Sequence, residues 1–168
     1  MRRRLLLLSA VTCLALALAP LTTANNGNKP DRRITLDQGD GIIEGSCAFP
    51  VFGHIEGREI DTTFGIKDRT VLKLLGIFPG NTWTLTNIDS GKSITVGNTS
   101  SFHQLTEPDG SFTVKVVGRG VWPFENPLTG DPGIWYQHGQ VSGVFDADGS
   151  PISTKGTGSL VNLCSQLD

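Results

Sequence analysis

The chain has 168 residues, of which 38% are hydrophobic, with 14 basic and 16 acidic side chains. It has no basic stripe, and this balance argues against nucleic acid and anionic membrane surfaces as main partners. The export signal and the three cysteines carry the most information, because the compartment decides which thiols can pair.

Residues 1–24 are typical of a cleaved secretory signal peptide. Three arginines precede the apolar stretch 5–21, and Thr22 and Ala24 supply small residues before the cleavage point. The stretch is shorter than the ~20 residues of a spanning helix and contains Pro20, which favours cleavage over a membrane anchor. Cleavage removes three basic residues and no acidic one, leaving 11 basic and 16 acidic residues and a net charge of −5. We therefore predict a secreted or cell-wall-associated protein with no membrane span after cleavage.

Cleavage discards Cys13 and leaves Cys47 and Cys164, which predict one intramolecular disulfide in an exported protein. Two free thiols, or pairing with another chain, are the alternatives. A zinc site is disfavoured, because neither thiol has a second cysteine or a histidine at ligand spacing. We expect no metal or cofactor, and we expect the disulfide to join the first and last β segments.

The mature chain is predicted to be one all-β domain. Residues 25–33 are polar and are predicted as a disordered lead-in to a domain over 34–168. That region is rich in Gly, Thr, Val and Ile, with turn signals at short intervals and alternating segments such as the one from Phe112 to Val116. We expect an antiparallel β-barrel or closed β-sandwich of about eight strands, with little or no helix.

One segment, residues 71–78, fits two kinds of secondary structure. Val71, Leu74, Leu75 and Phe78 follow a helical stripe, whereas the short run and its internal glycine favour a strand. We predict a strand and leave the helix open.

Polar candidates for chemistry are few. His54, Glu56 and Arg58 are two residues apart, so a strand would place them on one face, most simply as a solvent-exposed charge pattern. His103 and His138 are isolated and are predicted as surface or turn residues. No serine lies in a nucleophile elbow. We predict no catalytic residue.

The segment 121–130 is an aromatic connection rich in proline and glycine. Trp122 and Phe124 lie in it, and Trp135 follows. Exposed aromatic side chains in such a loop would form a binding surface, and these three residues are the predicted contact residues. The alternative is a hydrophobic plug at one end of the domain.

Several segments resemble a family of small exported actinobacterial β-rich proteins that has no assigned activity. The resemblance covers residues 47–164 and rests on turn motifs in the segments 85–93, 108–113, 117–120, 139–149 and 156–164. It implies an exported β domain and lends no catalytic residue. The Gly118-Arg-Gly120 segment followed by Gly139-x-Val141 also resembles the eight-stranded barrel of dirigent proteins and allene oxide cyclases, at the level of the fold alone.

The leading functional prediction is a secreted, non-enzymatic binding or surface-interaction module for a small apolar ligand or a cell-surface component. One alternative is a barrel-type enzyme that acts on a bound hydrophobic or phenolic molecule. Another is a structural protein of the cell envelope. An open cavity that holds an ionisable group would favour the enzyme, and a core filled by side chains would leave loop-mediated binding.

Overall fold

Residues 30–65 and 72–168 are described by the computed structural model of the protein, and they form one antiparallel sheet with a short helix. Alternating, β-branched segments separated by glycine-containing turns account for the strands. The elements are β1 (Arg32–Asp37), β2 (Asp40–Ile43), β3 (Val51–Glu56), β4 (Arg58–Gly65), β5 (Leu72–Ile77), β6 (Asn81–Asn87), β7 (Ser93–Thr106), β8 (Phe112–Trp122), β9 (Trp135–Phe145), β10 (Pro151–Asn162) and α1 (Cys164–Leu167).

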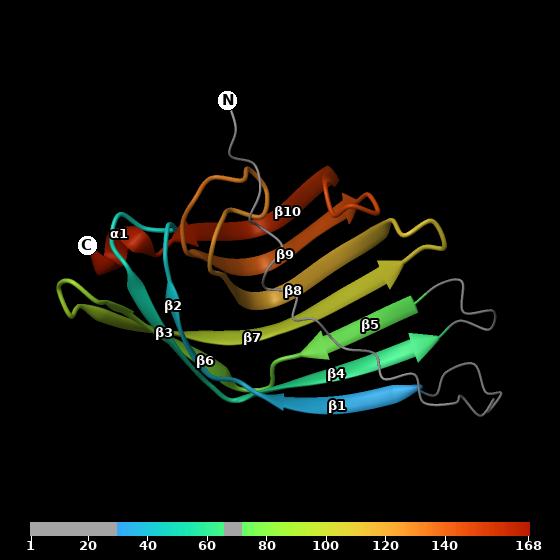
Figure 1. Ribbon diagram of the computed structural model, residues 1–168, viewed down its shortest axis with the longest axis horizontal. Coiled ribbons are helices and arrows are strands. Elements are labelled where there is room, and N and C mark those ends of the chain that lie inside the picture. Colours follow the sequence, from blue (N-terminus) through green and yellow to red (C-terminus); the bar gives the residue numbers. More distant parts are fainter. Residues whose placement is uncertain (1–29, 66–71) are drawn as a thin grey trace.

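The strands follow an up-and-down path when β1 with β2, β3 with β4, and β5 with β6 are each counted as one long run. β7 is the longest strand: its first half pairs with β6, and its second half lies between β5 and β8. β8, β9 and β10 then follow one another to one edge, while the other side ends at β1 and β2 (Figure 1). Short interruptions, such as the single residue Gly57 between β3 and β4, divide long runs into pairs of strands. The count therefore exceeds the eight strands expected.

The prediction of a single-domain, antiparallel all-β fold is confirmed. The sheet is curled but open, because β1 and β10 do not pair with each other (Figure 1). The segment 72–77 is the strand β5, as predicted. Within the described residues no helix is long and apolar enough to cross a membrane. Residues 1–24, and with them the predicted signal peptide, lie outside the described residues.

Alternation divides the sheet into two faces. Leu85 pairs with Ile94, and eight residues further along β7 Phe102 pairs with Val116. Leu85, Val116 and Val141 are all buried, and we call their side of the sheet the inner face. Side chains of the opposite parity form the outer face.

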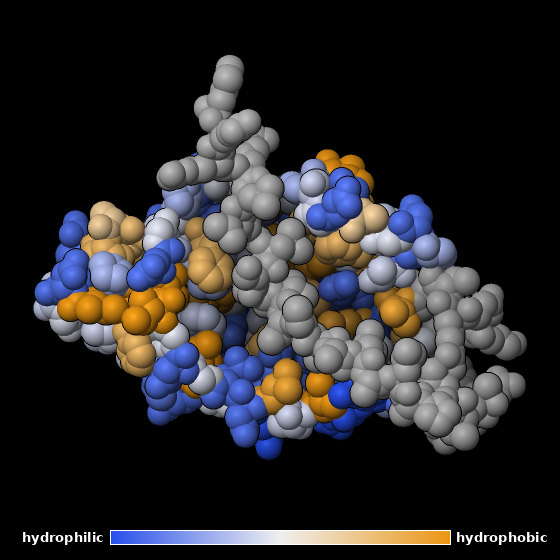
Figure 2. All heavy atoms as spheres, in the orientation of Figure 1, coloured by the Kyte–Doolittle hydropathy of each residue, from blue (hydrophilic) through white to orange (hydrophobic). Residues whose placement is uncertain are grey.

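The hydrophobic core lies at the end of the sheet that carries α1. It contains buried residues from β2, β3, β6, the chain beside β9 and the C-terminus: Ile43, Val51, Leu85, Ile134, Leu163 and Leu167. Figure 2 shows one group of hydrophobic residues at this end of the molecule, with others scattered among hydrophilic residues over the rest of the visible face. The core thus fills only part of the inner face.

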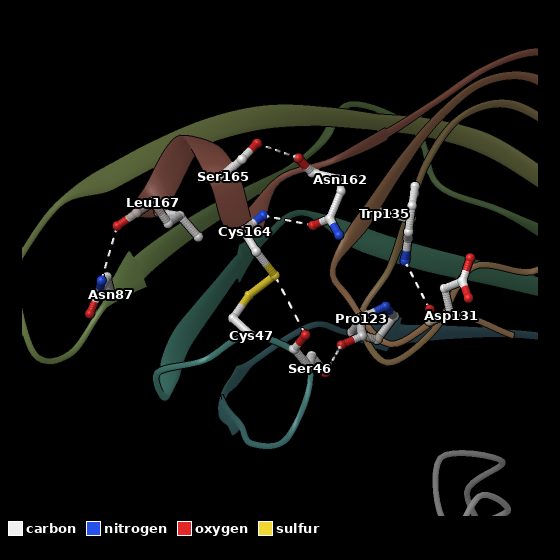
Figure 3. Close-up of a disulfide and its surroundings, with 10 residues drawn as sticks. All are labelled: Ser46, Cys47, Asn87, Pro123, Asp131, Trp135, Asn162, Cys164, Ser165 and Leu167. Atoms are coloured by element: carbon white, nitrogen blue, oxygen red, sulfur yellow. Dashed lines mark hydrogen bonds between the residues drawn. A yellow bond between two sulfur atoms is a disulfide. The ribbon is translucent and has the colours of Figure 1, made fainter.

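The Cys47–Cys164 disulfide is confirmed, with a Cα–Cα distance of 5.5 Å (Figure 3). Its expected position was wrong, because Cys47 lies in the loop between β2 and β3 and Cys164 begins α1. Both cysteines pack against the core. The Ser46 hydroxyl donates to the Pro123 carbonyl at 2.7 Å, so the same loop also holds the connection after β8. The disulfide joins the β2–β3 loop to the C-terminal helix at the core end rather than two strands.

The start of the domain also differs from the prediction. Arg32 and Arg33 are part of β1, where they pair with Thr63 and Thr62 of β4. The backbone N–H of Gly65 also donates to the Asp31 carboxylate. Polar residues can form an exposed edge strand when a neighbouring strand supplies the backbone partners, and the sequence of a single segment does not show this. The remainder of the predicted lead-in, residues 25–29, lies outside the described residues.

Candidate functional site

A groove of about 600 Å³ lies across five strands of the outer face. We call it the outer groove. β5, β7, β8, β9 and β10 contribute to it, and its most informative lining residues are Lys73, His103, Leu105, Lys115, Val144 and Lys155. Its walls are therefore far apart in sequence and are brought together only by strand pairing.

Strand register explains why basic side chains gather in the outer groove. His103 of β7 pairs with Lys115 of β8, and Lys115 pairs with Ser142 of β9, which in turn pairs with Lys155 of β10. Directly paired residues of antiparallel strands share a face, so these four side chains form one row across the sheet. Lys73 lies in the adjacent row, where it pairs with Leu105.

The outer groove is electropositive. Its lining includes three lysines and no carboxylate, although the chain has a net charge of −2. Within the described residues, Lys73, Lys115 and Lys155 form no salt bridge. The Lys73 ammonium lies 5.6 Å from the centre of the Phe64 ring. Ammonium groups that lack a nearby carboxylate are available to an anionic ligand.

His103 responds to this environment. Burial lowers the pKa of His103, and the charges of Lys73 and Lys115 lower it further. Its Nε2 atom lies 3.1 Å from the Ser101 hydroxyl, which shares its face of β7. The structure thus places His103 on strand β7, partly exposed in the outer groove, rather than in a turn.

A pair of carboxyl groups lies on the opposite, inner face. Glu59 and Asp61 are two residues apart on β4 and lie over Gly76 of β5, which has no side chain to exclude them. The Gln38 amide donates to Glu59 Oε2 at 3.1 Å. Burial raises the pKa of both carboxyls, and the negative charge of Asp61 raises that of Glu59 further. Glu59 and Asp61 were missed in the sequence, although their spacing on a strand was a usable signal.

His54 belongs to an exposed charge cluster. His54 pairs with Asp40 across β2 and β3, and its Nδ1 atom lies 2.5 Å from Asp40 Oδ1. Its Nε2 atom lies 3.5 Å from Glu56 Oε1, whereas Arg58 follows the interruption and belongs to β4. In the part of the chain that the structure describes, no three His, Cys, Asp or Glu residues are arranged to hold a metal ion. The cluster is therefore a cross-strand charge pattern in solvent.

Two of the three aromatic residues predicted to form a contact surface are paired in the sheet, and the third, Phe124, lies in the connection after β8. Trp122 ends β8 and pairs with Trp135 at the start of β9. The Trp122 indole N–H donates to Gln137 Oε1 at 2.9 Å, and that of Trp135 donates to the Asp131 carbonyl at 3.2 Å (Figure 3). Phe124 is 41% exposed. They stay a predicted contact surface, separate from the outer groove.

Comparisons with family models, with curated proteins and with solved structures found no match for this chain. The candidate site therefore rests on the geometry of this protein alone.

Proposed function

We propose that the protein is an exported binding protein that holds a small anionic amphiphile in the outer groove. The observation that supports this most is the set of Lys73, Lys115 and Lys155 around one groove without a carboxylate in its lining. The groove volume of about 600 Å³ is that of a small-molecule site. Ammonium groups would bind the acidic end of the ligand.

The same lining suits the rest of an amphiphile. Leu105 and Val144 contribute apolar surface between the lysines. Lysine side chains also present apolar stems beneath their charged ends, so the cations need not interrupt apolar contact. A ligand with an apolar body and one acidic group uses both properties, whereas a sugar or a cation uses neither.

Native mass spectrometry of protein from its own culture medium would identify a retained ligand. Calorimetry with dodecanoate, dodecanol and dodecyltrimethylammonium would test the chemistry directly. We expect dodecanoate to bind most tightly and the cationic probe not to bind. Equal binding of all three probes would reject the electrostatic part of the proposal.

Matched variants locate the site. Lys115→Met removes one groove cation but keeps an apolar stem, and it is expected to weaken dodecanoate binding about tenfold, since a charged hydrogen bond contributes more than 1 kcal/mol. Arg119→Met removes the same charge from the same strand, at a residue outside the groove lining. Equal losses in the two variants would place the ligand elsewhere.

An enzyme that acts on the bound molecule is the second candidate, and one contact favours it. The Ser101 hydroxyl lies 3.1 Å from His103 Nε2, and the lowered pKa of His103 keeps the imidazole neutral and able to accept a proton. A Ser101–His103 pair would predict hydrolysis of p-nitrophenyl dodecanoate that is lost in Ser101→Ala. Binding of dodecanoate without turnover of the ester would leave the protein a binding module.

A further inference from the structure

Strand β10 forms an open edge of the sheet. Within residues 30–65 and 72–168 it pairs only with β9, and it makes no backbone–backbone hydrogen bond to any other element. In an antiparallel edge strand, alternate residues direct their N–H and C=O groups away from the sheet. β10 therefore presents a template for another strand.

Two outer strands of the sheet, β1 and β10, differ in how many charged side chains they have. β1 has three charged side chains in six residues, namely Arg32, Arg33 and Asp37. β10 has one charged side chain, Lys155, in twelve residues. Two of its hydrophobic residues are exposed, Ile152 by 64% and Val161 by 42%. Charges on an edge strand normally prevent pairing with another chain, so β10 is open to association in a way that β1 is not.

A row of glycines bends the sheet and so limits which strand can pair with β10. Gly118, Gly139 and Gly158 pair with one another across β8, β9 and β10, with φ values of 111°, 134° and 104°. A Cβ atom on Gly139 would overlap the Thr157 carbonyl oxygen, and one on Gly158 would overlap that of His138. A strand that extends the sheet must follow the same bend, so a residue with little or no side chain fits opposite Gly158. At the other end of the row, Ser100 of β7 lies opposite Gly118.

We propose that β10 pairs with β10 of a second copy of this chain, antiparallel about a two-fold axis through Gly158. This register places the glycine of each copy opposite the other, and it continues the glycine row by one strand. A two-fold interface is self-complementary, so one register satisfies both copies.

Charge also permits this register. Lys155 of one copy lies opposite Val161 of the other, whose exposed side chain would cover the apolar stem of the lysine. The two copies of Lys155 are six residues apart along the strand direction, about 20 Å at 3.3 Å per residue. This separation exceeds the Debye length of about 8 Å at physiological salt, so the lysines do not oppose pairing.

The second copy would also contribute to the outer groove. Ser153, Thr154 and Lys155 form the β10 wall of that groove. Val161 of the second copy would lie beside Lys155 and extend the wall with an apolar side chain. The pairing is inferred from the edge of the sheet and does not depend on the proposed ligand.

Sedimentation velocity over a range of concentrations tests the dimer. Wild-type protein is expected to form dimers, and Val161→Lys, which places a lysine opposite Lys155 at two symmetric positions, is expected to weaken them about tenfold. Val161→Glu should strengthen the dimer at low salt. Ile42→Lys makes the same change at an exposed residue of β2 and should have no effect. A monomer at every concentration, or a dimer that Val161→Lys leaves unchanged, would overturn the proposal.

A cysteine pair tests the register. In Lys155→Cys/Val161→Cys, the thiol at position 155 of one copy faces the thiol at position 161 of the other. Cα atoms of residues paired in this way lie about 4.5–5.5 Å apart. The two positions are too far apart within one chain to bond to each other. We expect a covalent dimer with a 155–161 link in peptide maps and none with Lys155→Cys alone. Equal cross-linking of the single variant, or no 155–161 link in the pair, would reject the Gly158 register.

Discussion

The carboxyl groups of Glu59 and Asp61 lie side by side over Gly76, on the face of the sheet that buries Leu85 and Val116. Both pKa values are raised, chiefly by burial, so protonation of these carboxyls is more favourable in the folded protein than in the unfolded chain. At neutral pH the two carboxyls are negatively charged, and folding removes part of the water around these charges. The pair therefore lowers the free energy of unfolding.

Glu59→Gln is expected to stabilise the protein at neutral pH. A carboxyl whose folded pKa is raised contributes stability that is fully present below its unfolded pKa and is lost as pH rises through the folded pKa. The variant should therefore gain about 1 kcal/mol or less at pH 7, since the pair is half-exposed and screened, and the gain should vanish toward pH 4. Urea unfolding at several pH values measures the gain at pH 7 and its disappearance toward pH 4. Glu107→Gln removes an exposed carboxylate of equal charge, and a gain of the same size there would contradict the pair's role.

The Cys47–Cys164 disulfide closes a loop with a sequence separation of 117 residues. In the chain-entropy model a loop of this length stabilises the fold by about 5 kcal/mol, and measured values are commonly smaller. Cys47→Ser/Cys164→Ser is expected to lose about 2–5 kcal/mol of unfolding free energy in urea. Reduced wild-type protein is the matched comparison. A double variant as stable as the oxidised protein would show that the core alone holds this end.

Local patterns account for much of the fold but not for the outer groove. Alternation places Phe112 and Val116 on one face, and both lie on β8 four residues apart, in an uninterrupted register with β7. No local pattern shows that Lys73 and Lys155 line one groove, since that depends on the pairing of five strands. Register is set by long-range packing, and a single sequence contains little information about it.

The carboxyl pair and the disulfide also show which features a single sequence can predict and which it cannot. Glu59 and Asp61 have the two-residue spacing that places side chains on one face of a strand, and they lie together on β4. Their burial depends on Gly76, which lies on another strand. The disulfide was predictable because a predicted export signal that contains Cys13 leaves one simple pairing, whereas its place between a loop and α1 was not.

Leu167 anchors the short helix α1 in the core. Its side chain is fully buried, and its carbonyl accepts a 2.9 Å hydrogen bond from the Asn87 amide (Figure 3). Leu167→Ala is expected to cost about 2–5 kcal/mol, as other buried leucine truncations do. Gln166→Ala is the control, because Gln166 is exposed on the same helix. Equal stability of the two variants in urea would mean that α1 is held by the disulfide and not by packing.

The His54 imidazole should titrate above its ordinary pKa. Its hydrogen bond with Asp40 is the largest cause, and Glu56 adds to it. The stability that this provides is present below the unfolded pKa of about 6.5 and is lost as pH rises through the folded pKa. Asp40→Asn removes the carboxylate that raises the pKa of His54 most, and it should return this pKa toward 6.5. NMR titration of the ring protons measures it, with His103 as an internal reference whose pKa is lowered. If Asp40→Asn leaves the His54 titration unchanged, the Asp40 contact does not persist in solution.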